Sequence, residues 1–513
     1  MIMSSLPALI EQMQQPDFYP HPVVEPIQLM QTHISYVLLT GEFVYKIKKP
    51  VNFGFLNYST LELRSQFCQE EIRLNQRGAA ELYLEVVSIT QKGDKYQLNG
   101  TVEVVEYAVK MRQFSQETLF SHLLEEAKIT PELITELGLT IAQFHAKAAT
   151  NEYISSFGKV AQVKAVVDDN YQYTEKYIGI AQSQSQYTET KAFTDNFFAT
   201  NQELFASRIA NGYIRECHGD LHLRNICLGS NNRILLFDCI EFNEEFRFAD
   251  VMYDVAFVVM DLDAKKRRDL GNIFLNTYIE QTGDWSGIEL LPLYLCRQAY
   301  VRAKVASFLL SDRTISDAEK QDATQTAANY YKLAWEYTQP QTGKLILMSG
   351  VSGSGKSTVA KQLAPQINAI HVRSDAVRKH LAVIPLTDKG GKDLYTPEMT
   401  DRTYGKLLDI GIRLANQGFK VILDAKYDRQ ALRSEVITQA QPHHIPIQII
   451  HCTAPEEIIR ERLKLRHGDI SDATVDLLSS QLANAEPFTE TEMVYVTDVD
   501  TIITQSLADE SLS

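Results

Sequence analysis

The chain has 513 residues, of which 44% are hydrophobic and 22% are charged, and this size and composition indicate a globular protein of two to four domains. Its 65 acidic residues outnumber its 50 basic ones, and the net charge of −15 disfavours broad electrostatic binding to nucleic acid. No apolar run approaches the roughly 18 residues of a membrane span, and the first residues lack a signal-peptide pattern. That absence of a span predicts no membrane partner. The six cysteines form no C-x-x-C pair, and in a chain of this size we expect reduced thiols and a cytoplasmic location.

The first 340 residues predict a β-rich part, at about 30–114, and a helical part, at about 115–335. The hairpin ISYVLLTGEFVYKI opens the β-rich part, a helix is predicted from about Thr60 to Arg77, and LYLEVVSI and YQLNGTVEVVEYAVKMRQF alternate like strands. A further strand is predicted at 233–242, RILLFDCIEF, between helical stretches.

A polar stretch, WEYTQPQTGK at 335–344, marks the predicted boundary between domains at 1–340 and 341–513. After it come five short apolar runs separated by helical text: KLILMSG, AIHVRSD, KVILDA, IQIIHCTA and MVYVTDV. Strands that are apolar throughout are buried on both faces, so this half predicts an α/β domain with a five-stranded parallel sheet.

The stretch GVSGSGKST at 350–358 fits the pattern G-x-x-x-x-G-K-[ST], with a strand before it and a helix after it. Its backbone N–H groups would converge on phosphate oxygens, Lys356 would reach the β and γ phosphates, and the Ser357 hydroxyl would bind Mg²⁺. A plain Gly/Ser turn is the alternative, which the flanking strand and helix disfavour. The predicted ATP-binding residues here are Gly350, Ser352, Gly353, Ser354, Gly355, Lys356, Ser357 and Thr358.

Polar residues follow the next two strands of this half. Asp375 comes at the end of the second strand, where it could accept a proton from an acceptor hydroxyl, and Arg378 could bind that acceptor. The alternative is that Asp375 caps a helix starting at 376. Asp424 ends the third strand and is a candidate ligand for Mg²⁺.

Two arginines on a later helix, Arg462 and Arg466, are four residues apart and therefore share a face. They fit a lid that closes over the phosphates of ATP, and a solvated basic face is the alternative.

This half resembles the small P-loop kinases of the polynucleotide-kinase and zeta-toxin-like group in GVSGSGKST, SDAVR, KVILDA and RERLKLRHGDISDA, over about 345–500. The resemblance implies transfer of phosphate from ATP to a hydroxyl of a small molecule, a nucleotide or a nucleic-acid end. It makes Asp375 the catalytic base, Arg378 an acceptor clamp and Arg466 a lid residue.

A second, unrelated pattern lies in the first half. In HGDLHLRNIC, Asp220 precedes Asn225 by five residues, and Asp238 follows thirteen residues later at the end of a strand. This order is typical of kinases in which the first Asp serves as base while the Asn and the second Asp hold Mg²⁺.

Such a site needs a strand lysine for the phosphates of ATP and a helix acid to pair with it. Lys46 in FVYKI is the candidate lysine, and an ordinary strand lysine beside Lys48 and Lys49 is the alternative. Of the helix acids Glu70 and Glu71, the apolar spacing favours Glu71.

These residues, with ELGLTIAQFHAKAA, LLFDCIEF and FADVMYDVAF, resemble the aminoglycoside phosphotransferase family over about 30–335. The resemblance implies an α+β, bilobal protein-kinase-like fold, with Asp220 as base, Asn225 and Asp238 as metal ligands, and Asp254 as a structural aspartate. Lys46 and Glu71 would then position ATP. The chain lacks an acidic C-terminal tail that would suit a cationic aminoglycoside, which disfavours a role in drug resistance.

As a whole, the chain resembles bacterial proteins that join a phosphotransferase-like domain to a P-loop domain. We expect a bifunctional, ATP- and Mg²⁺-dependent kinase acting on small-molecule or nucleotide acceptors. Two alternatives stay open: a regulatory protein in which one half senses nucleotide, and a nucleic-acid end kinase, which the acidic charge disfavours.

Overall fold

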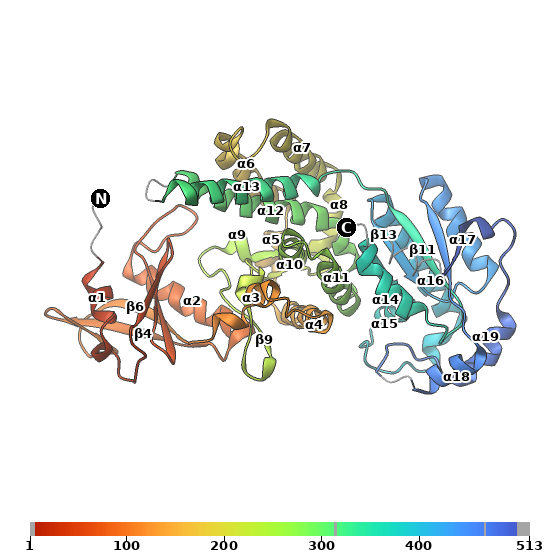
Figure 1. Ribbon diagram of the computed structural model, residues 1–513, viewed down its shortest axis with the longest axis horizontal. Coiled ribbons are helices and arrows are strands. Elements are labelled where there is room, and N and C mark those ends of the chain that lie inside the picture. Colours follow the sequence, from red (N-terminus) through yellow and green to blue (C-terminus); the bar gives the residue numbers. More distant parts are fainter. Residues whose placement is uncertain (1–5, 312–314, 466–467, 500–513) are drawn as a thin grey trace. The chain divides into compact units, whose positions relative to one another are not determined.

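The computed structural model describes residues 6–311, 315–465 and 468–499, and the chain divides into two compact units (Figure 1). The first unit comprises residues 1–130, 143–169 and 198–258, and the second comprises the stretches between and after them. The chain therefore crosses between the units repeatedly within its helical part. Within the described ranges, every helix is too short or too polar to span a lipid bilayer.

The first unit is built on an antiparallel sheet in the order β1-β2-β3-β6-β4-β5. Its strands are β1 (Gln28–Gln31), β2 (Ser35–Leu39), β3 (Phe43–Lys48), β4 (Tyr83–Lys92), β5 (Lys95–Leu98) and β6 (Val104–Arg112). The predicted hairpin is the pair β2–β3. Strand β1 was not predicted, because QLMQ is a largely exposed edge strand with no apolar alternation.

The two faces of this sheet are covered by different segments. Helix α1 (Ala8–Met13) packs against the face that carries Tyr45 and Ile47. Helix α2 (Leu61–Ala79) packs against the opposite face, where its Cys68 meets Val44. Because side chains alternate along a strand, Lys46 and Lys48 share the α2 face with Val44.

Helix α2 begins where the sequence predicted it. Thr60 is the N-cap, and its side chain accepts a hydrogen bond from the Leu63 N–H at 3.3 Å, which satisfies one of the exposed donors of the first turn. The helix buries Glu71 as well as apolar residues, and this buried acid is the feature that the site uses.

Short strands carry the predicted catalytic loop. Strand β7 (Ile214–Glu216) pairs with β10 (Phe248–Asp250), and β8 (Ile226–Leu228) pairs with β9 (Ile234–Leu236). The strand predicted at 233–242 is thus shorter than expected. The chain turns sharply after it, and Asp238 has a left-handed φ of 63°.

The predicted helical stretches are helical. Those between residues 115 and 265 are α3 (Phe120–Glu125), α4 (Pro131–Lys147), α5 (Glu152–Ser156), α6 (Val160–Thr174), α7 (Gln184–Thr200), α8 (Gln202–Ala210), α9 (Glu244–Arg247) and α10 (Val251–Ala264). Three more follow in the second unit: α11 (Arg268–Thr282), α12 (Leu291–Phe308) and α13 (Asp317–Glu336).

The second unit contains the predicted five-stranded parallel sheet, in the order β12-β13-β11-β14-β15. Its strands are β11 (Lys344–Ser349), β12 (Ala369–Arg373), β13 (Lys420–Asp424), β14 (Ile447–His451) and β15 (Val496–Asp498). The helices that follow these strands are α14 (Lys356–Ile367), α15 (Ser374–Leu381), α16 (Pro397–Asn416), α17 (Gln430–Ala440), α18 (Glu456–Leu465) and α19 (Leu478–Asn484).

Helices cover both faces of this sheet (Figure 1). Helix α14 packs against the face that carries Ile346 and Ile422. Helix α16 packs against the other face, where Gly411 approaches Leu345 and Leu423. Both faces are buried, which explains why the strands are apolar throughout.

Candidate phosphoryl-transfer sites

The first site brings together three charged residues from a strand, a helix and a loop. Lys46 Nζ on β3 lies 2.8 Å from Glu71 Oε1 on α2 and 2.7 Å from Asp238 Oδ1 beyond β9. The sequence named all three, and Glu71 rather than Glu70 faces the lysine. Glu70 instead pairs with Arg73 on the surface of the helix.

Electrostatics keep this triad ionised. Burial alone would lower the pKa of Lys46, but the carboxylates of Asp238 and Glu71 raise it well above its usual value. Burial would raise the pKa of Glu71, and the two nearby lysines lower it instead. A charged lysine is therefore held ready beside a carboxylate, an arrangement suited to binding phosphate.

A second lysine, Lys48, is part of the same cluster and was not predicted. It is 1% exposed, and its Nζ donates to Glu71 Oε2 at 2.6 Å and to Glu241. The Tyr58 hydroxyl also donates to Glu241. One sequence signal was available: Lys46 and Lys48 are two residues apart on a strand and so share a face. Their common partner, Glu71, could not be inferred from that spacing.

The predicted catalytic loop lies next to this cluster. The Asn225 amide nitrogen donates to the Asp220 backbone carbonyl at 2.9 Å and to Asp220 Oδ2 at 3.2 Å. This leaves the Asn225 amide oxygen as the group that could contact a cation. The Asp220 side chain is 39% exposed and that of Asp238 is 44% exposed, so both carboxylates can be reached from solvent.

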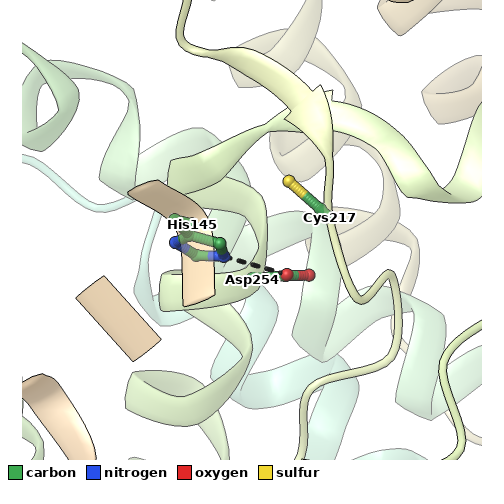
Figure 2. Close-up of side chains that lie close together, drawn as sticks. All are labelled: His145, Cys217 and Asp254. Atoms are coloured by element: carbon green, nitrogen blue, oxygen red, sulfur yellow. Dashed lines mark hydrogen bonds and ion pairs between the residues drawn. The ribbon is translucent and has the colours of Figure 1, made fainter. Parts of the chain in front are cut away.

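Asp254 fixes the backbone of the predicted catalytic loop. Its carboxylate accepts hydrogen bonds from the backbone N–H groups of His218 and Gly219, at 2.7 and 2.9 Å, and from His145 Nε2 at 3.1 Å. Figure 2 shows His145 and Asp254 in contact, with Cys217 close by. This placement agrees with the structural role that the sequence assigned to Asp254.

The trio of His145, Cys217 and Asp254 also has metal-ligand spacing, but its bonding does not suit a cation. Both Asp254 oxygens already accept backbone N–H groups. The Cys217 thiol donates to the Ala249 carbonyl, and burial raises its pKa well above the usual value. Because the thiol and both carboxylate oxygens already bond backbone groups, the contacts of this cluster give it a structural role.

The second site is the loop between β11 and α14. Gly350, Gly353 and Gly355 have φ values of 140°, 82° and 103°, a conformation that glycine adopts without strain. A Cβ on Gly355 would meet only the Arg462 guanidinium, at 3.5 Å, so the space beside this backbone is open. The Ser354 hydroxyl is buried and has no hydrogen-bond partner among the described residues. These features fit a cradle for phosphate.

A cleft of about 1440 Å³ opens from this loop. Every predicted loop residue from Ser352 to Thr358 lines it, whereas Gly350 packs beneath the loop against Cys452. The Lys356 ammonium donates to the Val351 carbonyl at 2.8 Å, inside the loop. Asp375, Arg378, Asp424 and Arg462 all line the same cleft. Arg466 lies outside the described residues.

Asp375 is not the helix cap that was weighed as its alternative. Helix α15 begins at Ser374, and Arg373 is its N-cap. Burial raises the pKa of Asp375, and Arg373 opposes this effect. Arg378 stacks on Tyr395, and its buried Nε has no hydrogen-bond partner among the described residues.

Asp424 has partners that the sequence did not reveal. His371 Nε2 lies 3.0 Å from Asp424 Oδ2, and Arg373 Nε lies 3.9 Å from the same oxygen. Burial alone would raise the pKa of Asp424, but the hydrogen bond from His371 and nearby positive charge lower it to about 2. His371 sits inside an apolar strand, AIHVR, and a lone polar residue in a buried strand was the available signal.

The charge of the cleft is mixed. Its acidic lining residues are Asp375, Asp424, Asp428, Asp469, Asp472 and Asp498, and its basic ones are Lys356, Arg378, Lys426, Arg429 and Arg462. Among the described residues, the lining of this cleft is therefore of both signs and is not the uniformly basic surface typical of a nucleic-acid groove.

The donor sets of both sites fit Mg²⁺ and ATP. Carboxylate and amide oxygens from Asp238 and Asn225 are the hard ligands that Mg²⁺ prefers, and Asp424 with the Ser357 hydroxyl offers the same chemistry at the second site.

Two different family models match the two parts of the chain that carry these sites. Residues 116–291 match the family model described as "Phosphotransferase enzyme family", and residues 345–488 match the model described as "AAA domain". The first match contains Asp220, Asn225 and Asp238, and the second contains the whole P-loop.

A curated relative covers nearly the full length. The chain is 30% identical over 469 residues to Uncharacterized protein Rv2004c of Mycobacterium tuberculosis. The matched region covers 90% of this chain and 91% of that protein. It is also 28% identical over 170 residues to a protein of Xenopus tropicalis named a probable gluconokinase, covering 30% of this chain and 85% of that one.

Among solved structures, a choline/ethanolamine kinase family protein from Mesorhizobium loti covers 64% of this chain and 99% of its own. The identity is 12% and the TM-score is 0.39.

Proposed function

The chain belongs to the same family as the Mycobacterium tuberculosis protein Rv2004c, and from this premise we propose a two-site kinase. Its two sites are separate, each uses Mg·ATP, and each transfers the γ-phosphate to a hydroxyl of a small-molecule or nucleotide acceptor. The observation that carries the proposal is the pairing of Lys46 with both Glu71 and Asp238, in a chain that also holds an open P-loop.

At the first site, side chains from separate elements would surround the phosphates. Lys46, fixed by Glu71, would contact the phosphates of ATP. Asp238 and Asn225 would hold Mg²⁺, which when bound neutralises charge on the transferring group. Asp220 would accept the proton of the acceptor hydroxyl, since its carboxylate is exposed and fixed by Asn225.

At the second site, backbone N–H groups rather than side chains from separate elements would surround the phosphates. The N–H groups of the P-loop would bind phosphate oxygens, and Lys356 would turn from the Val351 carbonyl to the phosphates. Ser357 and Asp424 would hold the cation, and Arg462 would close over the phosphates. Asp375 would serve as base, and Arg378 would hold the acceptor, because both line the cleft beside the loop.

The acceptor of the second site is proposed to be a small polyol or sugar acid. Two observations support this class: the mixed charge of the cleft, and the likeness of this half to the probable gluconokinase of Xenopus tropicalis. The buried Arg378 Nε could pair with an acceptor carboxylate or hydroxyl.

The test is transfer from γ-labelled ATP to gluconate, to a panel of polyols and to a cell metabolite extract. Wild type would be compared with Asp220→Asn and Lys356→Ala, and released inorganic phosphate would be counted separately. We expect each variant to lose one labelled product and keep the other.

Two results would contradict the proposal. Loss of both products in either single variant would show that the sites are not independent. Phosphate release without any labelled product would favour a protein in which one half senses nucleotide and regulates the other.

A further inference from the structure

Helix α11 binds the edge strand of the P-loop sheet through two asparagines. Asn276 Oδ1 accepts a hydrogen bond from the His371 N–H at 2.8 Å, and its Nδ2 donates to the Ala369 carbonyl at 3.0 Å. Asn272 Nδ2 donates to the same carbonyl at 2.9 Å and to Asn368 Oδ1 at 3.2 Å. One side-chain amide therefore bonds the outer edge of β12 as a neighbouring strand would.

The bonded strand leads directly to the cleft. Its residue His371 contacts Asp424 on the adjacent strand β13, at 3.0 Å. Two residues further along, Arg373 Nη1 lies 3.7 Å from Glu280 Oε1 of α11. Its Nη2 lies 2.8 Å from Asp469 Oδ1, and its Nε lies 3.9 Å from Asp424 Oδ2. The backbone carbonyl of Glu280 also lies 2.8 Å from His380 Nε2, on the helix that carries Asp375.

A short 3-10 helix, Trp285–Leu290, follows α11, and its contacts lead away from the cleft. Glu289 pairs with Arg413 and accepts from Gln417 Nε2 at 3.3 Å, both near the C-terminal end of α16. None of these three residues lines the cleft. They provide an internal comparison, because they join a neighbouring segment to α16 and not to β12.

We propose that Asn276 and His371 are positioning residues of the second site: Asn276 fixes strand β12 so that His371 holds the Asp424 carboxylate in place for Mg²⁺. Helix α11 lies within residues 116–291, the stretch that matches the phosphotransferase family. The P-loop site is thus completed by a helix from the part of the chain that carries the other kinase. This inference rests on the proposed role of Asp424 in holding the cation.

Asn276 and His371 would support the Asp424 carboxylate without contacting the cation themselves. An edge strand has unpaired N–H and C=O groups on its outer side, and its position is poorly fixed unless something pairs with them. Partners that orient a metal-binding carboxylate typically contribute 10–100-fold to metal affinity. We therefore expect about a tenfold effect or more from either residue.

The test uses the full chain carrying Lys46→Met, so that the first site is silenced. A non-hydrolysable ATP analogue is titrated by calorimetry with Mg²⁺ and again with EDTA, and the ratio of the two Kd values measures the benefit from the cation. Asn276→Ala and His371→Leu should each reduce this ratio by about tenfold or more while leaving the EDTA value nearly unchanged. Glu289→Gln, the matched control, should change neither.

Hydrogen exchange in the protein without nucleotide or cation gives a second readout. The His371 amide should exchange faster in Asn276→Ala than in wild type, and at the wild-type rate in Glu289→Gln. His371→Gln, which keeps a side-chain N–H donor, should recover part of the lost ratio.

An unchanged ratio in Asn276→Ala and His371→Leu would overturn the inference, and so would an equal loss with Mg²⁺ and with EDTA. Asp424→Asn separates the two ideas. If it lowers the ratio while the two positioning variants do not, only this inference fails. If it leaves the ratio unchanged, the proposed role of Asp424 itself is wrong, and the inference fails with it.

Discussion

Two adjacent lysines at the end of β3 have opposite environments. Lys48 is 1% exposed and bonded to Glu71 and Glu241, whereas Lys49 is partly exposed, donates to the Thr32 carbonyl and lies over the Tyr36 ring. Removing Lys48 would take away the lysine that pairs with the buried Glu241, and would leave Glu71 paired with Lys46. We expect Lys48→Met to lower the free energy of unfolding of the first unit by about 3–5 kcal/mol.

Lys49→Met is the control and should cost about 0–1 kcal/mol, because its charge is screened by water. Urea unfolding followed by hydrogen exchange of β3 would measure both. Equal effects at the two positions would show that the buried ion cluster contributes little to stability.

The second site should respond to pH through Asp375, its proposed catalytic base. A base acts only when ionised, and burial raises the pKa of this carboxyl above its usual 3.8. The rate of transfer should therefore fall as the pH is lowered through that raised pKa, at a higher pH than an ordinary Asp would give. The measurement is kcat/KM against pH in an Asp220→Asn background, and an acid limb that persists in Asp375→Asn would contradict the assignment.

At this scale the sequence predicted residues that belong to motifs. Asp220, Asn225 and Asp238 follow from their order and spacing, and Lys46 and Glu71 follow from what that motif requires. The contacts of Lys48, Glu241 and His371 could not be predicted, because they depend on which segments, distant in sequence, pack together.

Helix α2 must approach strand β9 closely for Glu71 and Asp238 to share a lysine. The close approach occurs at Gly78, where a Cβ would lie 2.6 Å from the Leu236 carbonyl oxygen and 3.0 Å from Leu236 Cβ. We expect Gly78→Ala to lower the free energy of unfolding by about 1–3 kcal/mol through overpacking, and to weaken nucleotide binding at the first site.

Gly405→Ala on helix α16 is the comparison, since nothing lies within 4 Å of a Cβ there. It should raise the free energy of unfolding by about 0.4–1 kcal/mol, as glycine-to-alanine changes do where the backbone is compatible. Thermal unfolding and calorimetric titration of both variants would test the contrast, and a neutral Gly78→Ala would show that α2 can shift without loss.

Elements with a strong apolar pattern, whether continuous or periodic, were predictable. The five apolar strands of the second sheet and helix α2 occur where the pattern placed them. Strand β1 was missed because it is polar and exposed, and the strand at 233–242 was drawn too long. The turn at Asp238 depends on contacts with Lys46 and Tyr83, which no local pattern records.

The residues of each site lie within a single compact unit. Nucleotide binding at one site should therefore be insensitive to loss of the other. Calorimetry with a non-hydrolysable ATP analogue should give two nucleotides per wild-type chain and one in either Lys46→Met or Lys356→Ala. A stoichiometry of zero in a single variant would show that the sites depend on each other.

The polar stretch at 335–344 looks from the sequence like a place where the protein could be divided, but helix α11, which precedes it, belongs to the same compact unit as the P-loop sheet. Recombination at that stretch would join α11 of one protein to the P-loop half of another. The strand β12 of that half would not have been selected alongside Asn276. Hybrids between relatives should therefore keep α11 and β12 from one parent. In evolution, these two segments should be inherited together although about ninety residues separate them.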